Sequence, residues 1–229
     1  MAERIKSGIP GLDEAIGGGL IKNSINLISG GPGAGKSIFS LSFIYFGALK
    51  YKEKGMYITF DESVEDLKND ALEFKWDFEP LEKQGLVRFV YIHPYEVELN
   101  KKIQEEIVAF SPRRVVLDSI STLSMAFEDA YEVRKELYKL AFFLKRMNIT
   151  AILTSEFQSE KDSFSRYGVE EYVADSVFVL HYGGFGGETD RTIRIIKMRR
   201  SSHIDGPIPI EINRKGLHVL TSDIEKFRV

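Results

Sequence analysis

Several residue types and sequence features are missing from this chain of 229 residues, and each absence excludes a class of protein. The sequence has no cysteine, which excludes disulfide bonds, thiolate catalysis and cysteine-based zinc sites. Its four histidines are scattered without the spacing of metal ligands: His93, His181, His203 and His218. No apolar run approaches the roughly 18 residues of a membrane-spanning helix, and the first residues lack the apolar core of a signal peptide. We therefore expect a cytoplasmic protein with no membrane contact.

The chain also has no excess of positive charge. Its 31 lysines and arginines are outnumbered by 34 aspartates and glutamates, which gives a formal net charge of −3. A protein that holds nucleic acid through its overall charge is normally basic, so this class is disfavoured. A local basic groove remains compatible with the composition. The hydrophobic content of 43% suits a globular domain with a sizeable core.

The front of the chain alternates between short apolar runs and amphipathic segments. Strands are expected at 25–29, 56–60, 86–92, 113–119 and 149–155, with helices between them. Four more strands joined by tight turns are expected at 177–180, 192–197, 208–212 and 217–220. The pattern predicts an α/β fold with a central, mostly parallel sheet flanked by helices and extended by C-terminal antiparallel strands. We expect one domain over 1–229, divided into a lead-in (1–24), a core (25–155) and a β extension (156–229).

One glycine-rich motif indicates the chemistry. Residues 30–37 read Gly-Gly-Pro-Gly-Ala-Gly-Lys-Ser and match the phosphate-binding loop, or Walker A pattern, at every position. Glycines let the backbone curl until its N–H groups point at phosphate oxygens. Lys36 is expected to reach the β- and γ-phosphates and to assist catalysis, while the Ser37 hydroxyl binds Mg²⁺. The expected nucleotide contacts are Gly31, Pro32, Gly33, Ala34, Gly35, Lys36, Ser37 and Ile38.

Two other strand ends carry carboxylates that suit a nucleotide hydrolase. Asp118 follows an apolar Val-Val-Leu run and is predicted to hold Mg²⁺ together with Ser37. An alternative is that Asp118 only caps the next helix. Glu62 ends another apolar strand, and we assign it as the base that activates water, with Asp61 as its partner or substitute. Helix capping is the alternative for this pair as well.

The fifth predicted strand ends in three polar residues, Thr154, Ser155 and Glu156. This end of the sheet faces the same crevice as the phosphate-binding loop, so these groups are candidates for sensing the γ-phosphate. A plain polar strand end explains them equally well, and both interpretations remain open.

Several segments together resemble the RecA superfamily of ATPases. These segments are the loop at 30–37, the strand ends at 60–63 and 117–119, and the lead-in at 7–13 and 17–19. Two later segments are similar to single-domain KaiC-type proteins, at 166–175 and 196–203. The resemblance covers about residues 5–220. It implies ATP as the nucleotide and a RecA-like core with strand order 5-1-4-3-2 or close to it.

The resemblance also implies an assembly. Subunits of such proteins pack head to tail in homo-oligomeric rings, a hexamer being one form, with ATP at each interface. The K-x-R segment of KaiC-type domains reaches the phosphates of the neighbouring subunit, and here it corresponds to Lys197 and Arg199. Ser201 and His203 fall where relatives contact the same nucleotide. A cation supplied in trans neutralises charge on the γ-phosphate and links hydrolysis to assembly; the alternative is a solvated basic strand.

The chain departs from the family pattern at three places. Glu170 and Glu171 lie near the position where self-phosphorylating domains carry adjacent Ser and Thr, which disfavours autokinase activity. Arg200 replaces the glycine usual after K-x-R, so a different local turn is expected. Asp205 stands where a further basic residue often occurs.

The sequence therefore favours a Mg²⁺-dependent ATPase that acts as an oligomeric switch. An alternative is a recombination accessory protein that binds single-stranded DNA through the loops 121–128 and 157–172. The later loop carries two cations and two aromatic rings: Lys161, Arg166, Phe164 and Tyr167. Its several carboxylates disfavour phosphate binding. A non-catalytic nucleotide sensor is a third interpretation, disfavoured because every expected catalytic residue is present.

Overall fold

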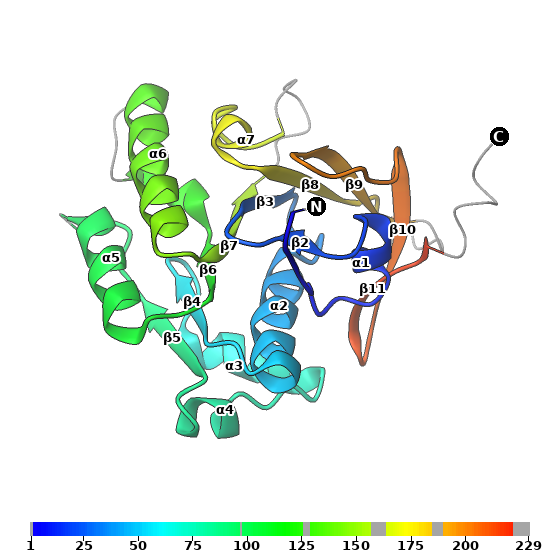
Figure 1. Ribbon diagram of the computed structural model, residues 1–229, viewed down its shortest axis with the longest axis horizontal. Coiled ribbons are helices and arrows are strands. Elements are labelled where there is room, and N and C mark those ends of the chain that lie inside the picture. The colour runs from blue at the N-terminus through cyan, green and yellow to red at the C-terminus, as the bar shows by residue number, and fades with distance from the viewer. Residues whose placement is uncertain (1, 97, 126–128, 157–163, 185–189, 222–229) are drawn as a thin grey trace.

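The computed structural model describes residues 2–96, 98–125, 129–156, 164–184 and 190–221, and a nine-stranded sheet forms its centre (Figure 1). The sheet order is β11-β10-β9-β8-β3-β7-β6-β4-β5. The strands are β3 (Ile25–Gly30), β4 (Gly55–Thr59), β5 (Val87–Tyr91), β6 (Arg114–Asp118), β7 (Thr150–Glu156), β8 (Ser176–Tyr182), β9 (Arg191–Met198), β10 (Pro207–Asn213) and β11 (Gly216–Val219). Strands β3 to β8 pair in parallel, and β9, β10 and β11 extend the sheet antiparallel. The predicted fold class is confirmed.

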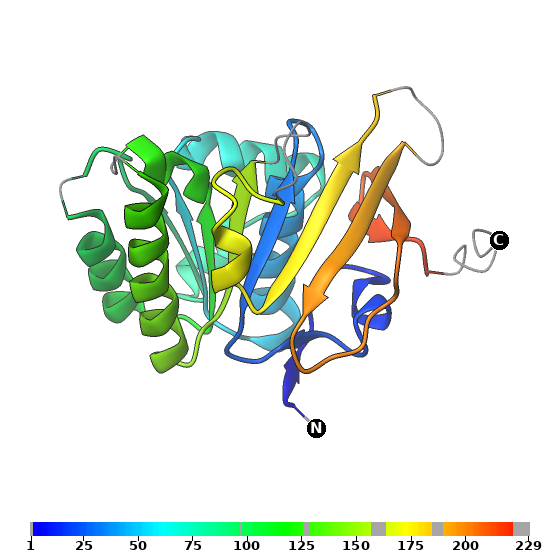
Figure 2. The same cartoon turned by 90° about the horizontal axis from the view of Figure 1, so that it is seen from above.

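Helices cover both faces of the sheet, so its central strands are buried on both sides (Figure 2). One face packs against α2 (Lys36–Tyr51), α3 (Val64–Glu73) and α4 (Glu79–Lys83). The other packs against α5 (Leu99–Phe110), α6 (Ala130–Arg146) and α7 (Glu170–Val173). Two-sided burial explains why the parallel strands read as continuous apolar runs. The short elements are α1 (Leu12–Ala15), the 3₁₀ helix η1 (Ile120–Met125) and the ribbon of β1 (Arg4–Ile5) and β2 (Leu20–Ile21).

Local sequence signals set where the crossover helices begin. Ser63 caps α3 by accepting a hydrogen bond from the Asp66 N–H, and Asp129 caps α6 by accepting one from the Glu132 N–H. Helix α2 instead follows Gly35 and has no side-chain cap, so its first N–H groups stay available for an anion. No helix among the described residues is both long and apolar enough to cross a bilayer.

The strand order agrees with 5-1-4-3-2 once β5 is set aside, because β8-β3-β7-β6-β4 has that order. The sequence interpretation counted the segment 86–92 as the third strand of the series, whereas β5 lies at the edge beyond β4. The fifth place belongs to β8, which pairs in parallel with β3, and not to the strand expected at 149–155. The parallel sheet therefore continues past residue 155.

The parallel strands give the molecule two distinct edges. Their carboxyl ends lead into the loop before α2, the turn before α3 and the start of η1. Their amino ends point the opposite way, toward the viewer in Figure 1 and downward in Figure 2. Because β9 runs antiparallel to β8, with Met198 opposite Ser176, the end of β9 lies at the amino edge. The start of β9 therefore lies at the carboxyl edge, and its end lies at the amino edge.

Candidate functional site

The glycine-rich loop joins β3 to α2 at the carboxyl edge. Gly33 and Gly35 have φ values of 71° and 101°, which L side chains rarely adopt. A Cβ on Gly35 would also lie 2.9 Å from the Ile212 side chain. The Lys36 ammonium donates hydrogen bonds to the carbonyls of Gly30 at 2.9 Å and Gly31 at 3.1 Å. Burial lowers the pKa of Lys36, and the nearby carboxylate of Asp118 opposes that shift.

A cavity of about 430 Å³ opens between this loop and the neighbouring strand ends. It gathers most of the residues that the sequence predicts for the site, from four different elements. The lining residues are Pro32, Gly33, Gly35, Lys36, Ser37, Ile38, Asp61, Glu62, Asp118, Ser119 and Glu156. The tertiary structure therefore brings the glycine-rich loop and the carboxylates of β4, β6 and β7 to one place.

The Asp118 carboxylate is held by two hydroxyl groups inside the sheet. The Tyr57 hydroxyl donates to its Oδ2 atom, and the Thr154 hydroxyl donates to its Oδ1 atom. Tyr57 is fully buried, and burial followed by the charge of Asp118 raises its pKa well above the usual value. Tyr57 was not predicted as a residue of this site, because its partner Asp118 lies on another strand. Thr154 contacts Asp118, so its polarity is explained without a phosphate.

Asp61 and Glu62 both line the cavity, and their environments differ in detail. Burial and then the charge of Asp118 raise the pKa of both carboxyl groups. Asp61 accepts a hydrogen bond from the Ser119 N–H, which opposes the shift. Glu62 is exposed to further repulsion from acidic residues of α3, Asp70 foremost. The assignment of the base to Glu62 or Asp61 stays a prediction.

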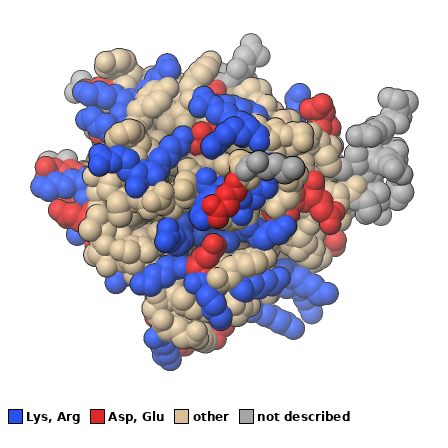
Figure 3. Space-filling model, in the orientation of Figure 1, with Lys and Arg blue, Asp and Glu red and all other residues tan. Residues whose placement is uncertain are grey.

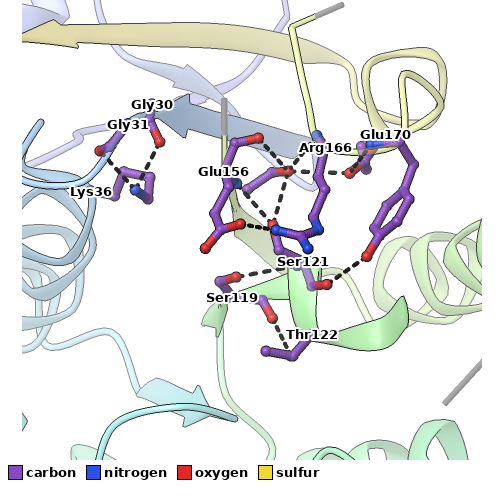
Figure 4. A network of polar contacts seen from close by, with 11 residues as sticks. Gly30, Gly31, Lys36, Ser119, Ser121, Thr122, Glu156, Arg166 and Glu170 are labelled. Atoms are coloured by element: carbon purple, nitrogen blue, oxygen red, sulfur yellow. Dashed lines mark hydrogen bonds and ion pairs between the residues drawn. The ribbon is translucent and has the colours of Figure 1, made fainter. Parts of the chain in front are cut away.

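Glu156 connects the cavity to a buried polar network (Figure 4). Its carboxylate pairs with Arg166, and its N–H donates to the Ser121 hydroxyl at 2.8 Å. The Ser155 hydroxyl donates to Glu170 at 3.1 Å, and the Glu170 side chain is 1% exposed. Of the three polar residues at the end of β7, only Glu156 is among those lining the cavity.

The Glu170 carboxylate organises the start of α7. It accepts hydrogen bonds from the Ser165 hydroxyl at 2.6 Å and from the N–H groups of Tyr167 and Val169. These bonds tie the segment before α7 to the helix itself. Glu170, which the sequence analysis noted only as a departure from the phosphorylated pattern, is therefore a buried structural carboxylate.

The K-x-R residues lie at the amino edge, opposite the glycine-rich loop of their own chain. Lys197 is level with Val177 on β8, and its ammonium donates to the carbonyls of Glu171 at 3.0 Å and Ala174 at 2.7 Å. Burial and the charge of Arg199 lower the pKa of Lys197. Arg199 lies 3.9 Å from Asp175. Neither cation is among the residues that line the cavity.

The two other predicted nucleotide contacts, Ser201 and His203, have partners in the lead-in or in their own loop. The Ser201 hydroxyl bonds to the Ile16 carbonyl at 3.0 Å and accepts from Arg4 at 2.8 Å. His203 contacts the Ile204 carbonyl through Nδ1 at 3.1 Å. Arg200 has a φ of 63°, the left-handed region that a glycine would favour. The turn therefore takes a glycine-like backbone conformation, and the expectation of a different turn finds no support.

The loops considered for DNA contacts are described only in part. Lys161 and residues 126–128 lie outside the described residues. The Arg166 cation is paired with Glu156, and the Tyr167 hydroxyl donates to the Ser121 carbonyl at 2.7 Å. Phe164 and Tyr167 pack against the hydrophobic core. These side chains are engaged within the protein, so the described part of the loop leaves few cations or aromatic rings free to contact a nucleic acid.

Two further residues contact the glycine-rich loop from the β8–β9 hairpin. The Arg191 guanidinium donates to the Gly33 carbonyl and lies 3.7 Å from the centre of the Tyr182 ring. A Cβ on Gly33 would meet that ring at 3.5 Å. Arg191 was not predicted as a residue of this site, because hairpin register decides which end of β9 faces the loop.

Comparisons with known proteins agree with this geometry. Residues 5–224 match the family model described as "ATPase: KaiC". The circadian clock oscillator protein KaiC of Parathermosynechococcus lividus is 34% identical over 225 residues, which cover 93% of this chain and 42% of that protein. KaiC of Synechococcus elongatus is 32% identical over 227 residues, covering 94% and 44%. The crystal structure of a KaiC-like protein from the hyperthermophilic archaeon Pyrococcus horikoshii gives a TM-score of 0.86 at 37% identity.

The extent of these matches differs between the two kinds of relative. The alignment with the archaeal structure covers 96% of this chain and 100% of that one. The chain spans less than half the length of the curated clock proteins that it matches. The family match and the shared fold extend over nearly the whole sequence, and both include the glycine-rich loop. The chain belongs to the KaiC-type ATPase family of the RecA superfamily.

Proposed function

We propose that this protein binds and hydrolyses ATP with Mg²⁺ and acts as an oligomeric switch. The observation that carries the proposal is the single cavity that joins Lys36 and Ser37 to the carboxylates of Asp61, Glu62 and Asp118. The family assignment supports nucleotide binding, and the residues of this cavity supply the groups that hydrolysis needs.

The donors in the cavity fit a triphosphate with its metal ion. Ser37 and Asp118 would hold Mg²⁺, which when bound neutralises charge on the phosphate oxygens. No group of three or more His, Asp or Glu side chains suited to a metal occurs among the described residues. This suits Mg²⁺, which commonly uses one or two carboxylates, waters and substrate phosphates in place of a protein cage. Lys36 and the N–H groups at the start of α2 would bind the phosphates.

Glu62 is the proposed base for the attacking water, with Asp61 as the alternative. A raised pKa suits this task, because a carboxylate with a higher pKa accepts a proton more readily. Asp118 would stay oriented through its bonds to Tyr57 and Thr154. All three carboxylates thus line the cavity, and Asp118 is in addition fixed by two hydroxyl groups inside the sheet.

Lys197 and Arg199 are proposed to act on the nucleotide of a neighbouring subunit. Their position at the amino edge, away from their own loop, supports action in trans over action in cis. Ser201 and His203 would lie at the same contact. Hydrolysis would then depend on assembly, and loss of the γ-phosphate would alter the contact between subunits.

The first test is steady-state hydrolysis of ATP by the purified chain, with and without Mg²⁺. We expect hydrolysis to require Mg²⁺. In Lys36→Ala, both hydrolysis and tight nucleotide binding should be lost. Wild-type nucleotide affinity in that variant would refute the assignment of the phosphate-binding loop. The assay is repeated with single-stranded DNA, since strong stimulation would favour the recombination role over the switch.

The trans arrangement is tested by mixing two inactive variants. Lys36→Ala lacks a working loop, and Lys197→Ala/Arg199→Ala lacks the cations. In mixed oligomers an intact loop can meet intact cations from the neighbouring subunit, so we expect part of the activity to return. No recovery, although both variants assemble together, would show that the cations act elsewhere.

A further inference from the structure

The end of β9, which carries the K-x-R residues, is attached to the end of α7. The Lys197 ammonium donates to the carbonyls of Glu171 at 3.0 Å and Ala174 at 2.7 Å. The Arg199 N–H donates to the carbonyl of Asp175, the next residue, at 3.0 Å. The place of both cations therefore depends on where α7 ends.

The Lys197 ammonium is held in place and still has capacity for a ligand. A lysine ammonium has three N–H donors, and in the described part of the chain the two carbonyls at the end of α7 use two of them. The third donor is available to a phosphate oxygen from another subunit. Figure 3 looks onto the amino edge and shows Lys and Arg atoms spread over it, which suits an anionic ligand.

Helix α7 is too short to be stable by itself. It has four residues, whereas helices shorter than about 12 residues are marginal in water without tertiary contacts. No side chain caps its start. Its first residue, Glu170, is 1% exposed and supplies such contacts through its carboxylate. The donors to this carboxylate are the hydroxyls of Ser155 and Ser165 and the N–H groups of Tyr167 and Val169.

We propose that Glu170 is a positioning residue for Lys197, and that it thereby controls hydrolysis of ATP in the neighbouring subunit. By fixing α7, the buried carboxylate fixes the two carbonyls that hold the ammonium. A displacement of about 1 Å at a reacting group can cost about 10²-fold in rate. This inference rests on the proposed action of Lys197 in trans.

The same carboxylate is also connected to the nucleotide cavity of its own subunit (Figure 4). Ser155, which donates to Glu170, directly precedes Glu156, and Glu156 lines that cavity. The Ser155 and Ser121 hydroxyls lie 3.4 Å apart, and Ser121 accepts from the Glu156 N–H. Action in cis through Glu156 is therefore the competing arrangement. Mixed oligomers separate the two, because the loop and the cation that meet come from different subunits.

The test uses Glu170→Gln, which keeps the size of the side chain and removes its charge. Alone, it should lower kcat for ATP about 10- to 100-fold. KM should stay close to the wild-type value, because the phosphate-binding loop is intact.

Two mixtures in equal amounts then show in which direction Glu170 acts. With Lys36→Ala, the rate should rise to about one quarter of the wild-type rate, because about a quarter of the subunits then join an intact loop to a wild-type cation. With Lys197→Ala/Arg199→Ala, the rate should not rise, since every cation is either missing or displaced.

Two results would overturn the proposal. Recovery with Lys197→Ala/Arg199→Ala but not with Lys36→Ala would show that Glu170 serves the cavity of its own subunit. A wild-type kcat in Glu170→Gln, or no recovery in either mixture although the subunits assemble, would leave Glu170 with a purely structural role.

The matched control is Glu106→Gln, the same change on α5, where Glu106 pairs with Arg88 at 3.9 Å and Lys102 at 3.5 Å. It should hydrolyse ATP as the wild type does. The mixture of Lys36→Ala with Lys197→Ala/Arg199→Ala is the reference. Recovery there, without recovery of Glu170→Gln by Lys36→Ala, refutes the role of Glu170 alone. If the reference fails too, action in trans is refuted, and this inference falls with it.

Circular dichroism shows whether Glu170→Gln folds. If it does not, Ser165→Ala takes its place in both mixtures, because it keeps the charge of Glu170 and removes one donor at 2.6 Å. The same pattern of recovery is expected with a smaller loss of kcat. A wild-type kcat in folded Ser165→Ala would then overturn the proposal.

Discussion

The buried hydroxyl of Tyr57 offers the sharpest test of how the carboxylate of Asp118 is prepared for a metal ion. Tyr57→Phe removes one donor from Asp118 and leaves the ring in place, so the packing of the sheet is retained. A hydrogen bond to a charged group contributes about 1.5–3 kcal/mol. Converted at about 1.4 kcal/mol per tenfold, this equals roughly 10- to 100-fold, the range found when groups behind a metal ligand are removed.

We therefore expect the Mg²⁺ concentration for half-maximal ATP hydrolysis to rise about 10- to 100-fold in Tyr57→Phe. The maximal rate at saturating Mg²⁺ should change much less, because the base and Lys36 are untouched. Thr154→Val removes the other donor to Asp118 and should shift the same curve. The assay titrates Mg²⁺ at a fixed nucleotide concentration and measures either ATP hydrolysis or the binding of a fluorescent nucleotide.

Tyr91→Phe is the matched control, since Tyr91 ends β5 with its side chain 47% exposed. It should leave the Mg²⁺ curve unchanged. The reasoning is refuted if Tyr57→Phe lowers the free energy of unfolding but leaves the Mg²⁺ requirement unchanged. That result would mean that the hydroxyl only satisfies a buried carboxylate.

Three further outcomes are expected. Glu62→Gln should keep nucleotide binding and slow hydrolysis about 10²-fold or more. If hydrolysis is unchanged in Glu62→Gln but is lost in Asp61→Asn, the base is Asp61. Burial and neighbouring carboxylates raise the pKa of Glu62, so this base becomes protonated, and hydrolysis slows, at a higher pH than for a free glutamate. A plot of kcat/KM against pH should therefore fall on the acidic side in the wild type, and this fall should be absent in Glu62→Gln. Glu53→Ala leaves the guanidinium of Arg114, which is 1% exposed, without its carboxylate and should cost about 1.5–3 kcal/mol in urea unfolding. Glu79→Ala, in a pair exposed to solvent, should leave the free energy of unfolding nearly unchanged.

Much of the core was predictable because its signals are local. The loop at 30–37 needs glycine at positions of positive φ, and a helix must start where Lys36 and Ser37 face the phosphates. The apolar runs marked the strands, and their polar ends marked Asp61, Glu62 and Asp118 as residues of one edge. Parallel strands connected by helices place their carboxyl ends together, so these residues meet in one cavity.

Other features depended on register and strand order, which single positions in the sequence do not encode. The pairing of β4 with β6 sets Tyr57 beside Asp118, and the pairing of β6 with β7 brings Thr154 to its other oxygen. The place of β5 at the sheet edge could not be read from its apolar pattern, because this edge strand packs against the core on both faces and so still reads as apolar.

The sequence by itself determined the α/β class and the glycine-rich motif at 30–37, since both rest on local patterning, and the family followed from its resemblance to KaiC-type proteins over several segments. Only the tertiary structure decided which side chains hold Asp118, that Glu170 is buried, and that Lys197 faces away from its own loop. These contacts join residues that lie on different strands. Their energies depend on burial and distance, and both arise only when the sheet is assembled.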